Sequence, residues 1–229
     1  MSDPQQIHDG IYIIGGPGIS HAQDAAVFIV QCGDELVMID SGAGINAEML
    51  TGNLVRLGLD PGRVTALVLT HCHVDHIGSA KYFQDTFACK VIAHELDAMA
   101  IETGDDILTA ASWYNTRLPR LRVDTKLTGE HEILRFDDEE IHCLHTPGHT
   151  PGSISVYLDR TGLRVLFGQD IHGPFSPEFL SDIGQWRDSM ENLLSLKADI
   201  LCEGHYGIFT GREKVRTYIE GYLDQYASL

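Results

Sequence analysis

Thr70-His71-Cys72-His73-Val74-Asp75-His76 directly follows the apolar, β-branched run at residues 64–69. Such a run is typical of a buried strand, so these polar residues lie where a strand gives way to a loop, a frequent place for chemistry on a rigid scaffold. In extended backbone His71 and His73 share one face, and Cys72 points to the other. Imidazole and carboxylate suit Zn²⁺, iron or manganese better than calcium. The stretch therefore predicts a metal site, against the alternative of four polar residues on a solvated loop.

Composition limits the classes of protein that the chain can belong to. Hydrophobic residues make up 43% of its 229 residues, which is typical of a globular protein with a large core. No apolar run approaches the roughly 20 residues of a membrane span, and the first residues lack the pattern of a secretory signal. Five dispersed cysteines without a Cys-x-x-Cys pair predict reduced, packed thiols and a cytoplasmic location. The net charge of −17 disfavours nucleic acid and anionic membrane as partners.

Hydrophobic patterning predicts strands and helices that alternate along both halves of the chain. In the first half we expect strands over 7–14, 25–32, 35–40, 64–69 and 89–93, with helices over 46–57 and about 77–85. In the second half we expect strands over 133–136, 140–145, 153–158, 163–167 and 198–202, with helices over 187–196 and 212–226. Because the halves share one plan, we predict a single mixed α/β domain over residues 1–229.

The segment at about 103–126 interrupts this alternation. It begins with a predicted helix that Pro119 ends, and the apolar face of that helix would consist of Ile107, Ala111, Tyr114 and Leu118. The tail of the segment carries a quarter of the chain's 16 basic residues, namely Arg117, Arg120, Arg122 and Lys126. In so acidic a chain this local excess of positive charge could attract an anionic group, and a solvated loop is the alternative.

Four further polar residues each follow an apolar strand. Asp40 precedes Ser41-Gly42, His149 lies in the bend Thr146-Pro147-Gly148-His149-Thr150-Pro151-Gly152, Asp170 follows Gly168-Gln169, and His205 follows Glu203-Gly204. Taken singly, each such residue is more often structural than functional. If the strands are neighbours in layered sheets, the bends meet at one edge, and His149, Asp170 and His205 then supply the three additional ligands that a two-metal site needs.

In this order, the set of residues resembles the metallo-β-lactamase-fold hydrolase superfamily over nearly the whole chain. The resemblance implies an α/β fold, a four-layer αββα sandwich of two mixed β-sheets flanked by helices. It also implies a role for each position. His71, His73 and His149 would bind a first metal ion, Asp75, His76 and His205 a second, and Asp170 both. Asp40 would orient a ligand histidine, as metal-bound imidazoles generally require.

The chemistry that this resemblance implies is hydrolysis. Two metal ions roughly 3.5–4 Å apart can share a water, lower its pKa and supply a hydroxide nucleophile, while one ion polarises the carbonyl under attack. Asp75 would be the catalytic carboxylate, which orients the water or passes its proton to the leaving group. We therefore predict a binuclear zinc hydrolase, with iron or manganese possible, that cleaves an ester, thioester or lactone-like acyl bond of a small molecule.

Within the superfamily the first motif is similar to the glyoxalase II-like branch. Glyoxalase II and persulfide dioxygenases usually carry a Gly-Cys-Gly-Arg-like stretch after the bridging aspartate, whereas here Asp170 is followed by Ile171-His172-Gly173-Pro174-Phe175. Glyoxalase II also has a longer C-terminal helical extension, which we do not find after the helix predicted at 212–226. We therefore expect a glyoxalase II-like chain without the features that recognise glutathione.

The segment at 103–126 is expected to cover the site and select the substrate. Trp113 and Tyr114 are candidate apolar walls, and Arg117 or Arg120 are candidate contacts for an anionic group. His172 is close enough to Asp170 to reach the substrate, although a hydrogen-bonded structural role is its alternative. The apolar residues of the segment could equally line the interface of a homo-oligomer.

Two other functions remain open. The ligand set His71, His149 and Asp170 would also hold the single iron of a persulfide dioxygenase, although the stretch after Asp170 departs from that class. A non-catalytic, metal-stabilised scaffold is the other alternative. Cys72, which is predicted to point away from the two histidines, is either a packed thiol or a nucleophile.

Overall fold

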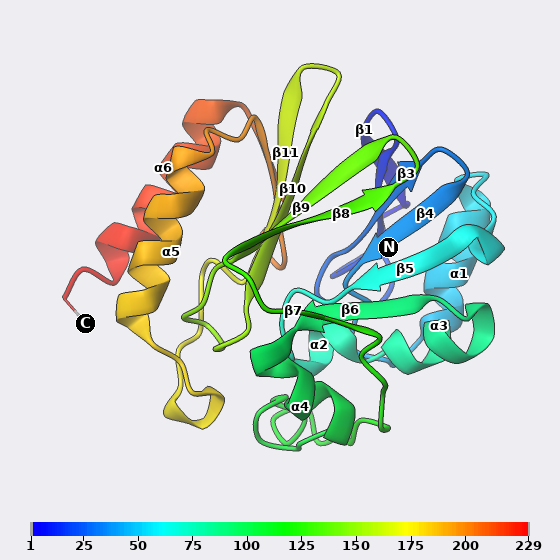
Figure 1. Cartoon of the computed structure of the whole chain (residues 1–229), viewed down its shortest axis with the longest axis horizontal. Helices are drawn as coiled ribbons and strands as arrows, with labels where there is room; N and C mark the ends of the chain where they lie inside the picture. Colours follow the sequence, from blue (N-terminus) through cyan, green and yellow to red (C-terminus); the bar gives the residue numbers. More distant parts are fainter. Residues whose placement is uncertain (1, 229) are drawn as a thin grey trace.

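The computed structural model describes residues 2–228 as two β-sheets packed face to face, with helices on both outer sides (Figure 1). The first and last residues of the predicted domain 1–229 lie outside the described residues. The helices α1 and α3 cover the outer face of one sheet, and α5 and α6 cover the outer face of the other. This arrangement confirms the predicted αββα sandwich.

The first sheet has seven strands in sequence order. Its first three pairings are antiparallel and its last three parallel, and its strands are β1 (Gln5–His8), β2 (Ile11–Gly15), β3 (Val27–Cys32), β4 (Glu35–Ile39), β5 (Val64–Val68), β6 (Lys90–His94) and β7 (Thr125–Leu127). The strands β4, β5 and β6 therefore all end at the same edge of the sheet.

The second sheet has six strands in the order β13-β12-β11-β10-β9-β8. Only β11 and β12 pair in parallel, and the strands are β8 (His131–Phe136), β9 (Glu139–His145), β10 (Ile154–Arg160), β11 (Leu163–Gln169), β12 (Ile200–Glu203) and β13 (Ile208–Thr210). Of these, β13 was not predicted, because three residues after a turn carry too short a pattern to stand out.

Within residues 2–228, six α-helices and two short 3₁₀ helices lie between or after the strands. They are α1 (Ala47–Arg56), α2 (Val74–Ile77), α3 (Ala80–Phe87), α4 (Glu95–Thr103), α5 (Ile183–Ser195), α6 (Arg212–Gln225), η1 (Pro61–Arg63) and η2 (Pro177–Phe179). The start of α1 follows from Asn46, whose side chain accepts a hydrogen bond from the Met49 amide. Leu50 and Leu54 then face the sheet, as the sequence spacing predicted.

Three apolar layers hold the sandwich together. The middle layer, between the two sheets, contains the fully buried pair Phe28 and Phe167, whose ring centroids are 5.2 Å apart. The two outer layers lie under the helices, for example around Phe83 on one side and Trp186 on the other. Because each sheet buries both faces, its central strands are apolar throughout and do not alternate.

Two predicted elements are divided in the structure. Residues 7–14 form the end of β1, a turn at Asp9-Gly10 and β2, because Gly10 adopts a positive φ of 62° that turns the chain back. The predicted helix at 77–85 becomes α2 and α3 with Gly78 between them. A side chain at Gly78 would meet the Ala43 carbonyl carbon at 2.1 Å. Only glycine therefore allows the junction between α2 and α3 to approach the backbone at Ala43.

The helix predicted at the start of the 103–126 segment is wrong. The helix in this region is α4, which ends where Gly104 adopts a left-handed conformation, and residues 104–124 contain neither helix nor strand. The Asp105 carboxylate accepts hydrogen bonds from the amides of Ile107 and Leu108, which stabilises a turn in place of a helix. The segment is therefore a chain of turns between α4 and β7.

No helix in residues 2–228 has the length and apolar character needed to cross a membrane.

The inter-sheet layer yields a stability prediction. Replacing the fully buried Phe28 with alanine removes its ring from the contact with Phe167 and leaves a cavity, so we expect the free energy of unfolding to fall by about 3–5 kcal/mol. Denaturant unfolding measures this change. The matched control is Val55→Ala on the exposed face of α1, which should change stability by no more than about 0.5 kcal/mol. A similar effect for both variants would contradict the assignment of this layer as the core.

A histidine pair between the sheets yields a pH prediction. His94, at the end of β6, is buried and stacks on His145, at the end of β9, with ring centroids 3.9 Å apart. Burial, followed by repulsion from His145, lowers the pKa of His94 to about 4. In the unfolded state His94 binds a proton near pH 6.5, whereas in the folded state it does so only near pH 4. The free energy of unfolding therefore keeps its whole His94 contribution above pH 6.5 and falls by up to about 3 kcal/mol as the pH drops towards 4.

The test compares urea unfolding of the wild type and of His94→Gln at pH 7.5 and pH 4.5, with a chelator present so that metal loss does not contribute. The wild type should lose more stability between the two pH values than the variant does. An equal loss in both proteins would show that His94 does not carry this part of the pH dependence.

Candidate metal centre

One edge of the sandwich collects polar side chains from both sheets. Asp40 follows β4, the loop at residues 70–76 follows β5, Asp170 follows β11 and His205 follows β12. His149 lies in the bend between β9 and β10. Because parallel strands end at the same edge and the two sheets face each other, residues up to 165 positions apart in sequence become neighbours here.

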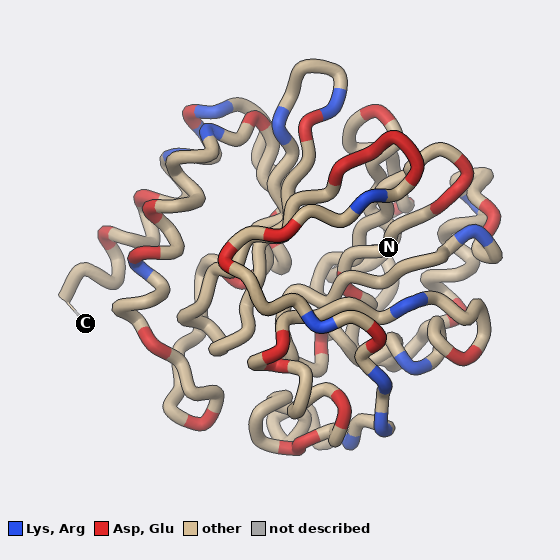
Figure 2. The backbone as a smooth tube through the Cα atoms, viewed as in Figure 1, with Lys and Arg blue, Asp and Glu red and all other residues tan. Residues whose placement is uncertain are grey.

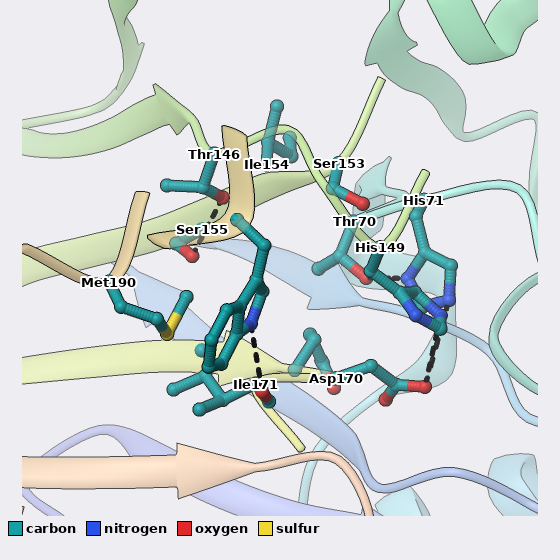
Figure 3. A pocket seen from close by; sticks show the side chains of 13 residues that line it. Thr70, His71, Thr146, His149, Ser153, Ile154, Ser155, Asp170, Ile171 and Met190 are labelled. Atoms are coloured by element: carbon teal, nitrogen blue, oxygen red, sulfur yellow. Dashed lines mark hydrogen bonds and ion pairs between the residues drawn. The ribbon is translucent and has the colours of Figure 1, made fainter. Parts of the chain in front are cut away.

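The first cluster consists of His71, His73, His149 and Asp170, each of which offers a ligand atom within 4.8 Å of the others. His149 Nε2 lies 2.9 Å from His73 Nδ1 and 3.4 Å from Asp170 Oδ2. His71 Nε2 is 3.9 Å from the same carboxylate oxygen. Figure 3 shows His71 and His149 side by side, with Asp170 facing them.

The second cluster consists of Asp75, His76 and His205. Asp75 Oδ2 lies 3.3 Å from His205 Nε2 and 3.8 Å from His76 Nε2. Asp75 and His76 come from the short helix α2, whose first turn carries both side chains into the site. His205 is the most accessible of the group, with 25% of its side chain exposed, so this cluster faces the opening of the site.

Asp170 joins the two clusters through its two oxygens. Oδ2 faces His71 and His149 of the first cluster. Oδ1 faces the second, at 3.1 Å from His76 Nε2 and 3.3 Å from His205 Nε2. One buried carboxylate therefore lies between two groups of imidazoles, which is the position of a bridging ligand.

The donor atoms of the site fit metal ions. His71 Nε2, His73 Nε2, His76 Nε2 and Asp170 Oδ1 are all buried without a hydrogen-bond partner. Such unpaired buried polar atoms are rare and costly in proteins, and a cation at the centre of each cluster would satisfy these. Imidazole nitrogens with carboxylate oxygens are the donors that zinc, iron and manganese accept.

The histidines of the two clusters differ in protonation. Burial lowers the pKa of His71 and of His73 well below the usual range, so both rings are neutral and ready to bind a metal. Burial also opposes the charged form of His205, but Asp170 and Asp75 outweigh it and raise the pKa of His205 to about 10. Without metal the second cluster therefore holds protons, which a bound cation would displace.

Asp40 fixes the orientation of His76. Its Oδ2 lies 2.6 Å from His76 Nδ1 and accepts a hydrogen bond from the Thr70 hydroxyl, while its Oδ1 accepts one from the Thr70 amide. Asp40 is fully buried and adopts a positive φ of 56°, which turns the chain sharply after β4. Because Nδ1 is engaged by the carboxylate, His76 presents Nε2 to the site.

Asp97 connects the two loops that carry the first cluster, and the sequence analysis missed it. Its Oδ2 accepts hydrogen bonds from the Cys72 amide and the Thr150 hydroxyl, and its Oδ1 accepts one from the Gly152 amide. Asp97 follows the end of β6, at the same edge as the ligand loops. The signal that could have revealed it is the rule applied to Asp40, an acidic residue just after an apolar strand.

The 103–126 segment lies against the site only in its first part. Thr109 accepts a hydrogen bond from the Val74 amide, and the Cys72 thiol donates one to the Leu108 carbonyl. The Cys72 side chain therefore points away from the clusters into packing, and burial raises its pKa far above the usual range. The Tyr114 hydroxyl is close enough to Asp75 that this carboxylate contributes to raising its pKa.

Aromatic rings form a wall beside the first cluster. The ring of Phe179, in η2, lies 4.4 Å from that of His73. Trp113 packs on Phe179 at 4.6 Å, and its indole N–H donates to Glu178. Trp113 remains 56% exposed. Phe179 was not predicted, because nothing in the sequence near Pro177 links it to His73.

The structure does not bring Arg120 and Arg122 to this site. Arg120 lines a surface cleft with Lys81, Lys90 and Arg122, beside the start of β6 and therefore at the opposite edge of the sheet. Figure 2 shows basic positions gathered along the backbone near α3 and the start of β6. The expectation that Arg120 contacts the substrate is thus wrong. The physical reason is topological: β7 runs parallel to β6, so the chain must return towards the start of β6 before it enters β7. Arg117 is exposed, 3.9 Å from Asp106.

His172 lies at the rim of the second cluster. One of its ring nitrogens is within 4.8 Å of the ligand atoms of Asp170 and His205, and its Nδ1 lies 2.8 Å from Glu203 Oε1. Glu203 is fully buried, and sequence reasoning did not single it out.

A small cavity of about 20 Å³ lies beside the first cluster, with His71 and His149 on one side and Met190 on the other (Figure 3). Trp186 also lines this cavity. The cavity has room for one water molecule and is too small for a substrate. On the side of the second cluster, the accessible side chain is that of His205.

Comparison with known proteins identifies the family of the chain. The sequence model of the metallo-beta-lactamase superfamily matches residues 23–205, which include every residue of both clusters. The chain is 27% identical over 205 residues to the probable metallo-hydrolase YybB of Bacillus subtilis, covering 86% of this chain and 88% of that protein. It is 26% identical to the human acyl-coenzyme A thioesterase MBLAC2, covering 96% of this chain and 86% of that protein.

Among solved structures, the fold is similar to that of the FEZ-1 metallo-beta-lactamase from Legionella gormanii. The TM-score is 0.84, and the match covers 99% of this chain and 95% of that chain at 19% sequence identity. This likeness shows the αββα fold. The glyoxalase II-like branch that the sequence suggested has no support in these comparisons and stays a prediction.

The Asp97 contacts yield a prediction about the site's framework. Replacing Asp97 with alanine leaves two buried amides and one hydroxyl without their acceptor, so we expect the free energy of unfolding to fall by about 3 kcal/mol or more. We also expect weaker binding of Zn²⁺, measured by competition with a chromogenic chelator, because both ligand loops lose their anchor.

The matched control is Asp105→Ala. Asp105 also accepts hydrogen bonds from two backbone amides, but at an exposed turn, so its loss should cost no more than about 1 kcal/mol and leave Zn²⁺ affinity unchanged. If Asp97→Ala matched this control in both measurements, the connecting role of Asp97 would be wrong.

Proposed function

The chain belongs to the metallo-beta-lactamase superfamily and is a metal-dependent hydrolase, and from that premise we propose that it is a binuclear zinc enzyme that cleaves an ester, thioester or lactone-like acyl bond of a small molecule. The observation that carries the proposal is Asp170, one buried carboxylate whose two oxygens face two separate groups of imidazoles. In this assignment His71, His73 and His149 hold the first ion, Asp75, His76 and His205 the second, and Asp170 both.

The metal ions, when bound, would lower the pKa of a water and polarise the carbonyl under attack. The chain's own residues would move the protons. Asp75 lies 3.3 Å from His205 in the second cluster, so it would take up the proton of the attacking water and deliver it to the leaving group. Tyr114 keeps its hydroxyl proton because burial raises its pKa, so beside Asp75 it acts as a hydrogen-bond donor.

The entrance favours an apolar acyl group over a charged one. Phe179 and Trp113 form a continuous aromatic wall that begins at His73. Because Arg120 lies at the opposite edge, the contacts that the 103–126 segment makes beside the first cluster are aromatic, and Arg120 adds no positive charge there. Arg117 and His172 stay candidates for contact with the polar part of the substrate.

The name of the MBLAC2 relatives supports a thioester as the first substrate to examine. The sequence supports a thioester whose thiol part is not glutathione, because the stretch after Asp170 differs from that of glyoxalase II. All five cysteines are unpaired and buried, which supports a reducing, cytoplasmic setting as part of the proposal.

The first experiment is metal analysis of protein purified both in air and without oxygen. We expect about two zinc ions per chain, followed by turnover in a panel of esters, thioesters and lactones. About one iron per chain, with oxygen consumed when a persulfide is added, would instead identify the dioxygenase. Two bound metals without turnover of any acyl substrate would support the scaffold.

A ligand substitution tests the assignment directly. His73→Ala removes a nitrogen ligand from the first cluster, so we expect the zinc content to fall by about one ion per chain and kcat/KM to fall at least about 100-fold. Metal analysis and initial rates measure the two effects. His131→Ala is the control, because His131 is exposed on β8 and should leave both unchanged. Full activity in His73→Ala would exclude the proposed centre.

A further inference from the structure

His172 has the surroundings of a metal ligand, although it lies outside the seven positions assigned above. It follows Asp170 by two residues, and only 13% of its side chain is exposed. Its ring stands edge-on to that of His205, with centroids 5.2 Å apart. The group formed by Asp170, His172 and His205 has its ligand atoms within 4.8 Å of one another.

A buried carboxylate holds this ring. Glu203 Oε1 lies 2.8 Å from His172 Nδ1, and Glu203 Oε2 accepts hydrogen bonds from the amides of His205 and Tyr206. One side chain with no exposed surface therefore orients both His172 and the loop that carries His205. Since Nδ1 donates its proton to the carboxylate, the lone pair of His172 is on Nε2.

The same arrangement occurs at the second cluster. His76 Nδ1 contacts Asp40 in the way that His172 Nδ1 contacts Glu203. Outside the two clusters, His172 is the one histidine within residues 2–228 that contacts a carboxylate. A histidine that binds metal typically donates its other ring N–H to a carboxylate or carbonyl, which fixes the tautomer and the ring plane.

Further contacts make the position rigid. The Tyr226 hydroxyl donates to the His172 carbonyl at 2.9 Å, and the ring of Tyr206 lies edge-on to His172 at 4.8 Å. Tyr226 comes from the end of α6, which the second cluster does not otherwise use. Such support is expected of a group that must hold one geometry, and is more than an exposed rim residue needs.

From this juxtaposition we propose that His172 is an additional ligand of the second metal ion, which binds through Nε2 and is oriented by Glu203. The proposal rests on the two-metal centre of the proposed function. It extends the second ligand set from Asp75, His76, His205 and Asp170 to five residues. The alternative is that the Glu203–His172 contact serves only to pack the two loops together.

The test measures metal binding rather than turnover. Metal-free protein is titrated with Co²⁺, and the affinity of each site is followed by calorimetry and by the visible absorption of the bound ion. For His172→Gln we expect the weaker of the two sites to lose about 10- to 100-fold in affinity with a changed absorption band, and the other site to stay unchanged. His131→Gln, which also removes one histidine but from an exposed position, should match the wild type.

Glu203→Gln separates ligation from packing. The amide keeps an oxygen for the amides of His205 and Tyr206, but it offers N–H to His172 Nδ1 and so shifts the ring proton to Nε2. If His172 is a ligand, this variant should weaken the same site while its far-ultraviolet circular dichroism stays native.

The outcomes distinguish this inference from the proposed function. Two Co²⁺ sites of unchanged affinity in folded His172→Gln would overturn the ligand role and leave the hydrolase intact. A wild type that binds two ions, one of them weakened in both variants, would support the ligand role even if no acyl substrate were turned over. A wild type that binds a single ion, unaffected by His172→Gln, would overturn the inference.

Discussion

The buried carboxylate of Asp170 is the constraint on which the site depends. It occupies the junction of the two sheets, with imidazoles on both sides and almost no solvent. An isolated carboxylate in such a place would be costly, and so would the unpaired ring nitrogens around it. Cations bound at the two clusters would offset both costs at once, so the groups that are costly without metal are suited to hold metal.

Three other buried carboxylates keep this edge in shape. Asp40 orients His76, Asp97 ties the loop of His73 to the loop of His149, and Glu203 supports the loop of His205. Each comes from a strand end or the residues just beyond it, and each accepts backbone or imidazole hydrogens. The same feature, a buried acidic side chain at the end of a strand, therefore occurs three times around the site. The apolar layers supply the bulk of the stability.

The segment at 103–126 shows how topology limits which residues reach the site. Its first half reaches the site through the carbonyls of Leu108 and Thr109, which contact the Cys72 thiol and the Val74 amide. Its second half must run back along the sheet to enter β7 in parallel with β6, and it carries Arg120 and Arg122 to the opposite edge. The same segment therefore supplies aromatic contacts at one edge and a basic surface at the other.

The sequence by itself determined the fold class and the residues of both clusters. A buried β-branched strand followed by His71, His73, Asp75 and His76 is a local pattern, and local patterns of apolar spacing also predicted most strands and helices. The branch, the substrate and the metal are not readable from such patterns.

Only the tertiary structure decided which strand ends meet and what each side chain faces. The partners of Asp97, Glu203 and Phe179 lie between 2 and 106 positions away, mostly on other elements, so no spacing in the sequence predicts them. Likewise the helix expected from Ile107 to Leu118 fails because the Asp105 turn and Gly104 compete with a weak helical pattern. Contacts across the sandwich are set by packing, and packing is not encoded in any one stretch of the chain.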